Sequence, residues 1–304
     1  MKRSIMVRSF IDINNFNKKQ INEIITIAKK IKKDPNKFSL ICKNKTLAMI
    51  FEKQSLRTRL SFNVGMKKLG GNVIELNSKE IGFDNKRESN GDVLKVLSQF
   101  VDCIMIRNNK HKEVLNLSDK KIIPIINGLT DYSHPCQILG DFLTIQEKVK
   151  DLKKLKITWI GDFNNVLRSL LHLQNIYLFE LDVVIPKQIL TLFRKELKLY
   201  YNKKIKFLSD PLIGSKNSKC IMTDVWVSMG DKNEKKIRYF KNFQVNKKIM
   251  KNATKNAIFM HCLPAKRGKE VTSDVLDGKH SVVLEQAKNR MFIQQAILIY
   301  VLKT

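Results

Sequence analysis

The fold is decided by the stretch Phe51-Glu52-Lys53-Gln54-Ser55-Leu56-Arg57-Thr58-Arg59. An apolar run at 46–51 leads into it, and the short length, polar borders and lack of helical period of that run predict a buried parallel strand. Leu56, Leu60 and Val64 then recur every four residues, which predicts an amphipathic helix over 56–69. Ser55 is a suitable N-cap, so the stretch predicts a strand, a short turn and a helix.

The first turn of this predicted helix is suited to binding an anion. A helix N-terminus has free backbone N–H groups and the positive end of the dipole, and both favour phosphate. The hydroxyls of Ser55 and Thr58 and the guanidinium of Arg57 add further donors. Arg57 and Arg59 point to roughly opposite sides of the helix, and we expect Arg57 to hold the ligand. Taken alone, the stretch is explained equally well by an ordinary capped start of a basic helix.

The length of the chain, 304 residues, is enough for two domains with separate cores, and its 43% apolar content is typical of soluble globular proteins. The longest apolar run, 296–302, is too short to cross a membrane, and the N-terminus lacks the pattern of a secretory signal. The five cysteines form no Cys-x-x-Cys pair. An odd number of cysteines without metal spacing predicts reduced thiols in a cytoplasmic protein.

The formal net charge of +29 is the most unusual global property. Such a charge can indicate nucleic-acid binding, or it can reflect a lysine-rich composition spread over solvated faces. The lysines are scattered from end to end, and aromatic residues are not interleaved with them as a stacking platform requires. We therefore expect no dedicated nucleic-acid role, although the charge can steer an anionic substrate.

Predicted strands and helices alternate along the whole chain, which indicates an α/β protein with two parallel sheets, each covered by helices on both faces. The polar segment 151–154 is the predicted boundary between a first domain at 1–150 and a second at 151–284. We expect the last helix, in 285–304, to pack back on the first domain. Strands are predicted at 46–51, 73–76, 103–106, 121–126, 157–160, 181–185, 205–208, 220–226 and 257–262, and helices at 19–33, 56–69, 92–100, 135–150, from 166, at 187–200, 239–252 and 285–302.

Ligands of such sheets bind beyond the carboxyl ends of the strands. Several chemically capable residues lie at or close to the carboxyl ends of predicted strands: Ser55, Arg107, Asn165, Asp224 and Cys262. Each has an ordinary structural explanation by itself. A histidine before a proline, such as His134, can begin a helix, a free cysteine is usually a small buried apolar residue, and Asp224 can cap a turn. Together they predict one polar region at the strand ends.

Ser55-Leu56-Arg57-Thr58-Arg59 resembles the carbamoyl-phosphate motif Ser-Thr-Arg-Thr-Arg of the transcarbamoylase family. The Ser-Met-Gly and His-Cys-Leu-Pro signatures resemble those of the ornithine branch, and the resemblance covers essentially the whole chain. Four further stretches resemble family motifs in the same order and spacing: His134-Pro135-Cys136-Gln137, Asp224-Val225-Trp226-Val227-Ser228-Met229-Gly230, His261-Cys262-Leu263-Pro264-Ala265 and Asn289-Arg290.

This resemblance implies transfer of the carbamoyl group of carbamoyl phosphate to the δ-amine of L-ornithine, giving L-citrulline and phosphate in arginine biosynthesis. It also implies a homotrimer with active sites at subunit interfaces and neither a metal nor an organic cofactor. Two alternatives remain: a sister enzyme that uses putrescine or an acylated ornithine, and a basic nucleic-acid-binding protein that has lost catalysis. Asp224 favours free ornithine, because a carboxylate suits the α-ammonium group.

The resemblance also assigns roles to individual residues. Three are expected to be catalytic: Cys262, Arg107 and His134. Those expected to bind carbamoyl phosphate are Ser55, Leu56 through its backbone N–H, Arg57, Thr58, Arg107, His134, Gln137 and Arg290. Those expected to bind ornithine are Asn165, Asp224, Ser228, Met229, Cys262 and Leu263, with the Leu263 backbone and Cys262 beside the reacting amine. The family also implies a cis peptide at Leu263–Pro264, a bond type that only proline commonly allows.

Three departures from the family pattern stand out. Leu56 replaces a threonine, which removes one hydroxyl but leaves the backbone donor. Phe163 replaces a small residue and can narrow the amino-acid pocket. The polar segment 79–90 is predicted to be a mobile loop, and it lacks a clear match to the family's glutamine contact, so Lys86 or Arg87 is a candidate replacement.

Overall fold

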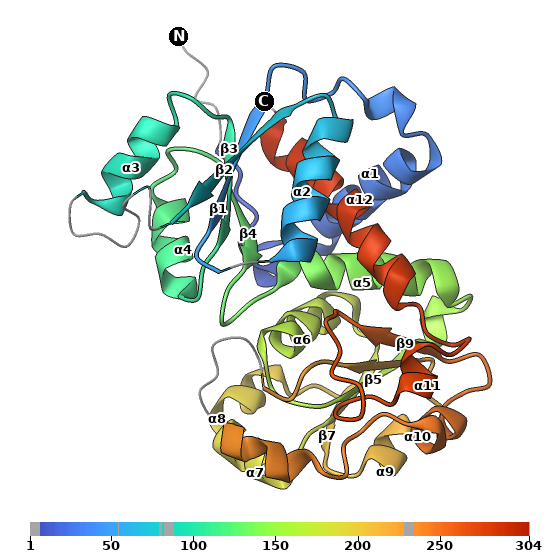
Figure 1. Ribbon diagram of the computed structural model, residues 1–304. Helices are drawn as coiled ribbons and strands as arrows, with labels where there is room; N and C mark the ends of the chain where they lie inside the picture. Colours follow the sequence, from blue (N-terminus) through green and yellow to red (C-terminus); the bar gives the residue numbers. More distant parts are fainter. Residues whose placement is uncertain (1–6, 54, 79–80, 82–87, 228–233, 304) are drawn as a thin grey trace. The chain divides into compact units, whose positions relative to one another are not determined.

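The structure is a computed structural model that describes residues 7–53, 55–78, 81, 88–227 and 234–303 (Figure 1). The chain forms two compact units: Met1–Gly140 with Lys288–Thr304, and Asp141–Ala287. The predicted boundary at 151–154 follows helix α5 (Pro135–Lys148), whereas the units divide inside that helix. The second division likewise falls inside helix α12 (Val283–Leu302).

The first unit contains a four-stranded parallel sheet in the order β2-β1-β3-β4. The two central strands are almost completely buried, and only Thr46 and Arg107 at their ends interrupt their apolar character, as expected where helices cover both faces of a sheet. The strands are β1 (Thr46–Phe51), β2 (Asn72–Asn77), β3 (Cys103–Arg107) and β4 (Ile125–Leu129), and the helices are α1 (Lys18–Lys33), α2 (Leu56–Lys68), α3 (Asn90–Leu97) and α4 (His111–Asp119).

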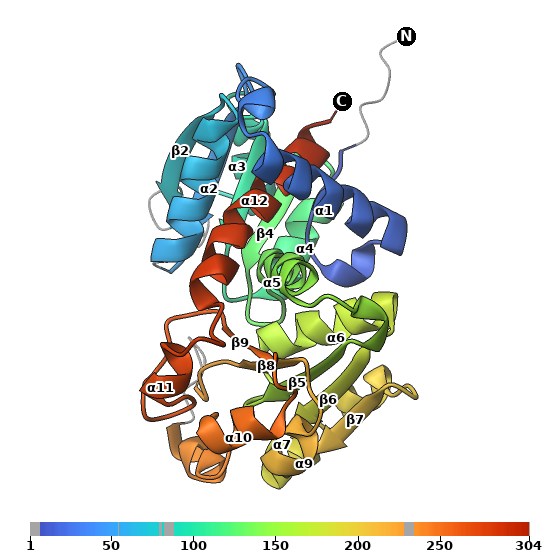
Figure 2. The same cartoon turned by 90° about the vertical axis from the view of Figure 1, so that its right-hand side faces the viewer.

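Helices lie on both faces of this sheet (Figures 1 and 2). On one face, Ala48 and Ile50 share an apolar cluster with Val93 of α3 and Val114 of α4. On the other face, α12 packs against α2, where the Gln295 amide donates to a backbone carbonyl, and against α1 (Figures 1 and 2). The expectation that the last helix packs on the first domain is confirmed.

Helix α2 begins where the sequence predicts, with the Ser55 hydroxyl accepting from the Thr58 N–H at 3.3 Å. However, the apolar residues that recur every four positions in α2 do not form its buried face. The side chains of Leu56, Leu60 and Val64 are 69%, 53% and 37% exposed. The residues that face the unit's interior are Thr58, Phe62, Gly65 and Met66.

The second unit contains a five-stranded parallel sheet in the order β7-β6-β5-β8-β9. Trp159, at the centre of this sheet, is fully buried. The strands are β5 (Lys156–Ile160), β6 (Glu180–Val184), β7 (Ile205–Leu208), β8 (Cys220–Thr223) and β9 (Ile258–His261). The helices are α6 (Asn165–Tyr177), α7 (Lys187–Leu192), α8 (Arg194–Leu197), α9 (Pro211–Ser215), α10 (Lys247–Asn252) and α11 (Ser273–Leu276).

The predicted class, two parallel sheets with helices on both faces, is confirmed, but several boundaries differ. Strand β4 starts at Ile125 and continues through Asn127-Gly128, which the sequence placed after the strand. The Asn127 amide donates to the Ile11 carbonyl, so tertiary contacts override a local turn signal. Strand β8 ends at Thr223 rather than at 226, and only Lys247–Asn252 of the helix expected at 239–252 is α-helical. Among the described helices, none combines the length and apolarity that crossing a bilayer requires.

Candidate functional site

Polar side chains gather at the carboxyl ends of the strands in each unit, as the sequence predicts. In the first unit, Ser55 lies just beyond β1, and Arg107 is the last residue of β3. In the second unit, Asp224 directly follows β8 and Cys262 directly follows β9. This is the edge of a parallel sheet at which ligands bind.

In the first unit, two guanidinium groups converge on one hydroxyl. Nη1 of Arg107 donates to Oγ1 of Thr58 at 3.1 Å, and Nη2 of Arg290 donates to the same oxygen at 2.5 Å. Nη1 of Arg290 also donates to Oε1 of Gln137 at 2.8 Å. All four residues are buried. Because Thr58 and Gln137 are neutral, these bonds orient the two positive charges without cancelling them, which suits an anionic ligand.

A close approach of two helices brings Gln137 to Arg290. Gly140 lies one turn after Gln137 in α5, and a Cβ at this position would be only 3.1 Å from the Cα of Arg290 in α12. A larger residue would require the α12 backbone at Arg290 to move by a few tenths of an ångström. The glycine therefore permits a contact between residues that are 153 positions apart in the sequence.

His134 precedes α5 and is buried beside the same arginines. Its pKa lies well below the ordinary value of 6.5, first because of burial and then because of the positive charges of Arg290, Arg107 and Arg57. The imidazole is therefore neutral at neutral pH. In this state one ring nitrogen can donate a hydrogen bond to a ligand oxygen.

The two arginines of the first turn of α2 have different surroundings. The Arg59 guanidinium forms an ion pair with Glu75 at 3.1 Å and lies over the Phe51 ring, 5.0 Å from its centroid. The Arg57 guanidinium makes no hydrogen bond or ion pair with any residue that the structure describes, although its charge acts on His134. Arg57 is thus the arginine available to a ligand at this end of the helix.

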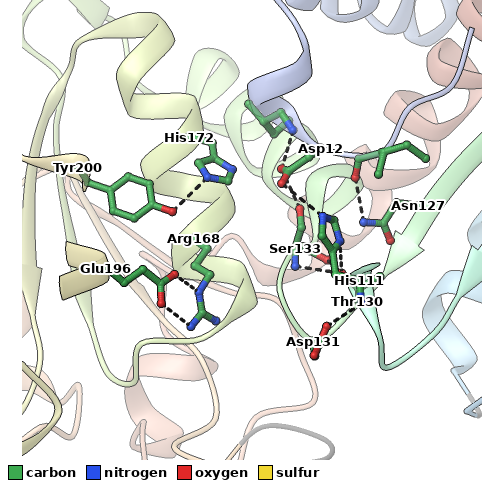
Figure 3. A network of polar contacts seen from close by, with 12 residues as sticks. Asp12, His111, Asn127, Thr130, Asp131, Ser133, Arg168, His172, Glu196 and Tyr200 are labelled. Atoms are coloured by element: carbon green, nitrogen blue, oxygen red, sulfur yellow. Dashed lines mark hydrogen bonds and ion pairs between the residues drawn. The ribbon is translucent and has the colours of Figure 1, made fainter. Parts of the chain in front are cut away.

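The turn before His134 is held by a polar network that the sequence did not reveal (Figure 3). The buried carboxylate of Asp12 accepts from the Ser133 hydroxyl at 2.9 Å and lies 4.0 Å from Nε2 of His111. Nδ1 of His111 is 2.9 Å from the Thr130 hydroxyl. These residues lie far apart in sequence, and no short motif connects them.

In the second unit, Asp224 is the centre of the polar group. Its Oδ2 accepts from Nδ2 of Asn164 at 2.7 Å, and its Oδ1 accepts from the thiol of Cys262 at 3.1 Å. Oδ1 of Asn164 also caps α6 by accepting the N–H groups of Val166 and Leu167. The sequence analysis did not name Asn164, whereas Asn165, which is expected to bind ornithine, is the first residue of α6. An asparagine directly before a predicted helix is an N-cap signal that could have identified Asn164.

The segment after β9 is held from within the same unit. Nδ1 of His261 accepts the Leu263 N–H at 2.9 Å, and Nε2 of His261 lies 3.2 Å from Oε1 of the buried Glu270. The Leu263–Pro264 peptide is cis, as expected. Ligand atoms of Asp224, His261 and Cys262 lie within 4.8 Å of one another, a spacing that a metal ion can use. Both ring nitrogens of His261 are nevertheless engaged in protein hydrogen bonds, which favours a positioning role for this histidine.

Four residues to which the sequence analysis gave a possible role lie outside the described residues: Ser228, Met229, Lys86 and Arg87.

Phe163, which departs from the family pattern, has a buried ring. The Phe193 ring centroid lies 4.7 Å from the Phe163 ring centroid, and the guanidinium carbon of Arg168 lies 4.4 Å from the Phe163 ring centroid. The Arg168 guanidinium is itself paired with Glu196 (Figure 3), so this aromatic packing accounts for a large residue at position 163.

Comparisons with known proteins agree over nearly the full length. The family model described as aspartate/ornithine carbamoyltransferase, carbamoyl-P binding domain, matches residues 8–147. The model described as aspartate/ornithine carbamoyltransferase, Asp/Orn binding domain, matches residues 153–301.

Relatives and solved structures are similar over almost all of both chains. The ornithine carbamoyltransferase of Rhodopseudomonas palustris is 41% identical over 99% of each chain, and that of Methanococcus vannielii is 44% identical over 86% of this chain and 89% of its own. The ornithine carbamoyltransferase of Pyrococcus furiosus is 38% identical over 97% of each chain, with a TM-score of 0.85. The anabolic enzyme of Campylobacter jejuni is 36% identical over 97% of this chain and 98% of its own, with a TM-score of 0.87. This chain belongs to the aspartate/ornithine carbamoyltransferase family.

Proposed function

We propose that this chain is an enzyme that transfers the carbamoyl group of carbamoyl phosphate to the δ-amine of L-ornithine, giving L-citrulline and phosphate. The observation that carries the proposal is the convergence of Arg107 and Arg290 on the Thr58 hydroxyl beside the N-terminus of α2. The relatives named above are ornithine carbamoyltransferases, which supports ornithine as the acceptor.

The first unit holds carbamoyl phosphate in this proposal. The N–H groups at the start of α2, the Ser55 hydroxyl and the Arg57 guanidinium bind the phosphate, which leaves with the negative charge. Arg107 adds a second positive charge. Neutral His134, with Arg290 and Gln137, donates to the carbamoyl oxygen and stabilises the negative charge that develops there as the tetrahedral centre forms.

The second unit binds the amino acid. The Asp224 carboxylate holds the α-ammonium group, and Asn164 fixes the orientation of that carboxylate. Ser228 and Met229 are proposed to contact ornithine by resemblance, as is Asn165 at the start of α6. The Leu263 N–H is bonded to His261, so its carbonyl is the backbone group that can accept from the substrate amine.

The δ-amine must lose a proton before it attacks, because an alkyl ammonium group of this kind has a pKa near about 10.4. Two roles for Cys262 follow. As a thiolate, its sulfur can accept that proton, with Asp224 orienting the group, or the residue can line the pocket while the solution supplies the free amine. The first role is favoured, because the hydrogen bond to Asp224 places the sulfur in a defined position.

The assembly is proposed to be a homotrimer with active sites at subunit interfaces. The exposed apolar stripe of α2, formed by Leu56, Leu60 and Val64, supports this assembly, because a second copy of the chain would remove it from water. The stripe begins in the same turn that binds phosphate. A cytoplasmic location and a role in arginine biosynthesis complete the proposal.

One assay tests the reaction. The purified protein is incubated with carbamoyl phosphate and, in parallel, with ornithine, putrescine or N-acetylornithine, and both ureido product and phosphate are measured. We expect citrulline and phosphate in equal amounts with ornithine and far slower turnover with the other amines. Preference for putrescine or N-acetylornithine would establish a sister enzyme.

A nucleic-acid-binding function is the second candidate, and the net charge of +29 is the observation that favours it. Salt-sensitive RNA binding together with no turnover of any amine would support this candidate against the enzyme.

A further inference from the structure

The residues around Cys262 contain a buried pair to which no catalytic step has been assigned. His261 is 1% exposed and Glu270 is fully buried, and their nearest atoms are 3.2 Å apart. Nδ1 of His261 accepts the N–H of Leu263, so this nitrogen carries no proton. The ring proton is therefore on Nε2, which donates to Glu270.

Glu270 is suited to holding that tautomer. An ionised carboxylate only accepts hydrogen bonds, so it excludes the tautomer whose Nδ1–H would face the Leu263 N–H. Burial opposes ionisation of Glu270, but hydrogen bonds from His261 and from the Lys266 N–H outweigh it and keep the pKa of the carboxyl below its ordinary value. The carboxylate is thus charged at neutral pH.

The peptide that this pair holds has an unusual backbone. Leu263 has a φ of 57°, in the left-handed region that residues with a side chain rarely adopt. Such a conformation persists only where its surroundings maintain it, and such residues cluster at functional sites. The bond from the Leu263 N–H to His261 is the contact that ties this backbone to the end of β9.

We infer that Glu270 and His261 are positioning residues, which hold the Cys262–Leu263 peptide so that the thiol faces Asp224 and the Leu263 carbonyl faces the acceptor amine. The chain of contacts runs from the Glu270 carboxylate through the His261 ring to the Leu263 N–H. Neither residue needs to touch a substrate. The part of this inference that concerns the acceptor amine rests on the proposed function, whereas the part that concerns the orientation of the Cys262 thiol does not.

The first test compares Glu270→Leu with Glu270→Gln in the full chain. Glutamine can still accept from Nε2–H, and leucine cannot. We expect Glu270→Leu to lower kcat/KM for ornithine by roughly tenfold or more, since small displacements of reacting groups have effects of this order. Glu270→Gln should stay within about threefold of wild type, and the Kd of carbamoyl phosphate, measured by calorimetry, should stay within about twofold in both variants.

The matched control is Asp182→Leu, which removes another buried carboxylate of the same unit, paired with Lys156 at 2.7 Å. This control should lower the Tm without changing kcat/KM for ornithine. A folded Glu270→Leu protein with unchanged kcat/KM would overturn the inference, as would equal losses in the glutamine and leucine variants.

The second test does not depend on catalysis. Cys262 is partly exposed, whereas the cysteines at 42, 103, 136 and 220 are buried, so iodoacetamide labelling followed by peptide mass spectrometry reports selectively on Cys262. We expect Glu270→Leu to change the labelling rate by more than about threefold, and Glu270→Gln to leave it near wild type. An unchanged rate in Glu270→Leu would contradict the inference even if the protein proved to have another activity.

A pair of histidine variants decides the question if Glu270→Leu fails to fold. His261→Asn retains an acceptor near the position of Nδ1, and His261→Gln retains a donor near the position of Nε2. The inference predicts that His261→Asn keeps the higher kcat/KM for ornithine and the more nearly native labelling rate. The reverse order, or no difference between the two, would overturn it.

Discussion

At the scale of single residues, Thr58 shows how a buried hydroxyl can organise charge. It is fully buried in the first turn of α2, and it accepts hydrogen bonds from Arg107 and Arg290, which come from β3 and α12. A carboxylate in its place would orient the same two groups but would neutralise much of their charge. The neutral hydroxyl leaves that charge available to an anionic ligand, which we propose is carbamoyl phosphate.

The difference between Arg57 and Arg59 predicts a difference in carbamoyl-phosphate binding. Arg59 is already paired with Glu75, whereas Arg57 is available. We expect Arg57→Ala to weaken binding by about 1.5–3 kcal/mol for each charge-assisted bond lost, with the Tm nearly unchanged. Arg59→Ala is the matched control. Calorimetric titration that found the larger loss in Arg59→Ala would show that the wrong arginine has been assigned.

The neutral state of His134 predicts a pH dependence of stability. The folded chain keeps this imidazole unprotonated, whereas the unfolded chain takes up a proton as the pH falls through about 6.5. The unfolded state then binds more protons, so the free energy of unfolding falls with decreasing pH, by at most about 1.4 kcal/mol per pH unit from this residue. Denaturant unfolding from about pH 7.5 to about pH 5 should show a shallower loss in His134→Gln. Parallel pH profiles for the two proteins would refute this.

Replacing Cys262 by serine separates its two proposed roles. If the sulfur helps to remove the proton of the δ-amine, Cys262→Ser should lower kcat by roughly 10²-fold and alter the pH profile of kcat. If the residue only lines the pocket, the main effect should be a higher KM for ornithine. We expect the first result. Near-normal kcat with an unmoved profile in steady-state kinetics would leave Cys262 as a binding residue.

At the scale of elements, α2 has two functions on two faces. Its buried face, with Thr58 and Phe62, packs in the first unit and includes the turn that we propose binds the anion. Its other face carries Leu56, Leu60 and Val64 in water. A leucine at position 56 fits this arrangement, because its side chain belongs to the exposed stripe and its backbone N–H remains at the helix start.

This stripe predicts how the assembly can be disrupted. Leu60→Glu places a charge at the centre of the stripe and should dissociate the proposed trimer, because burying an unpaired carboxylate costs several kcal/mol, on the order of the stability of many interfaces. Leu199→Glu is the control, since Leu199 is 77% exposed in the other unit. Sedimentation velocity should show a smaller species for the first variant and the parent species for the second. A Leu60→Glu protein of unchanged size would exclude the stripe as a subunit contact.

At the scale of the whole molecule, the dominant property is the net charge of +29, which arises from 57 basic and 28 acidic residues. The positive electrostatic field of such a chain raises the local concentration of anions and repels cations. This field weakens beyond a Debye length of about 10 Å at 0.1 M salt. The two proposed substrates differ in charge sign at neutral pH. The charge therefore acts on them in opposite directions.

A change in salt concentration should separate the effects of the net charge on the two substrates. Raising the ionic strength from about 20 mM to about 300 mM with potassium chloride should lower kcat/KM for dianionic carbamoyl phosphate several-fold. It should leave kcat/KM for ornithine unchanged or raise it. Initial rates at both salt concentrations, with the other substrate saturating, give both constants. Equal loss for both substrates would indicate a nonspecific effect of salt and no steering.

Local patterns in the sequence determined much of this protein. The apolar run at 46–51, the Ser55 cap and the alternation of strands and helices depend on neighbouring residues, so period and propensity are sufficient to predict them. The positions of Arg107 and Cys262 at strand ends follow from the same patterns, whereas Asp224 lies inside the strand predicted at 220–226. The motifs of the transcarbamoylase family then identified the chemistry.

Only the tertiary structure decided which residues meet. The bond from Arg290 to Thr58 joins positions 232 residues apart, and the bond from Asn164 to Asp224 joins positions 60 apart. The side of α2 that is exposed could not be predicted from the spacing of its apolar residues, because the same spacing occurs on a face that packs in the core and on a face that contacts another subunit. The Glu270–His261 pair likewise has no local signature. Partners of this kind depend on how separate elements pack, and packing is a property of the folded chain.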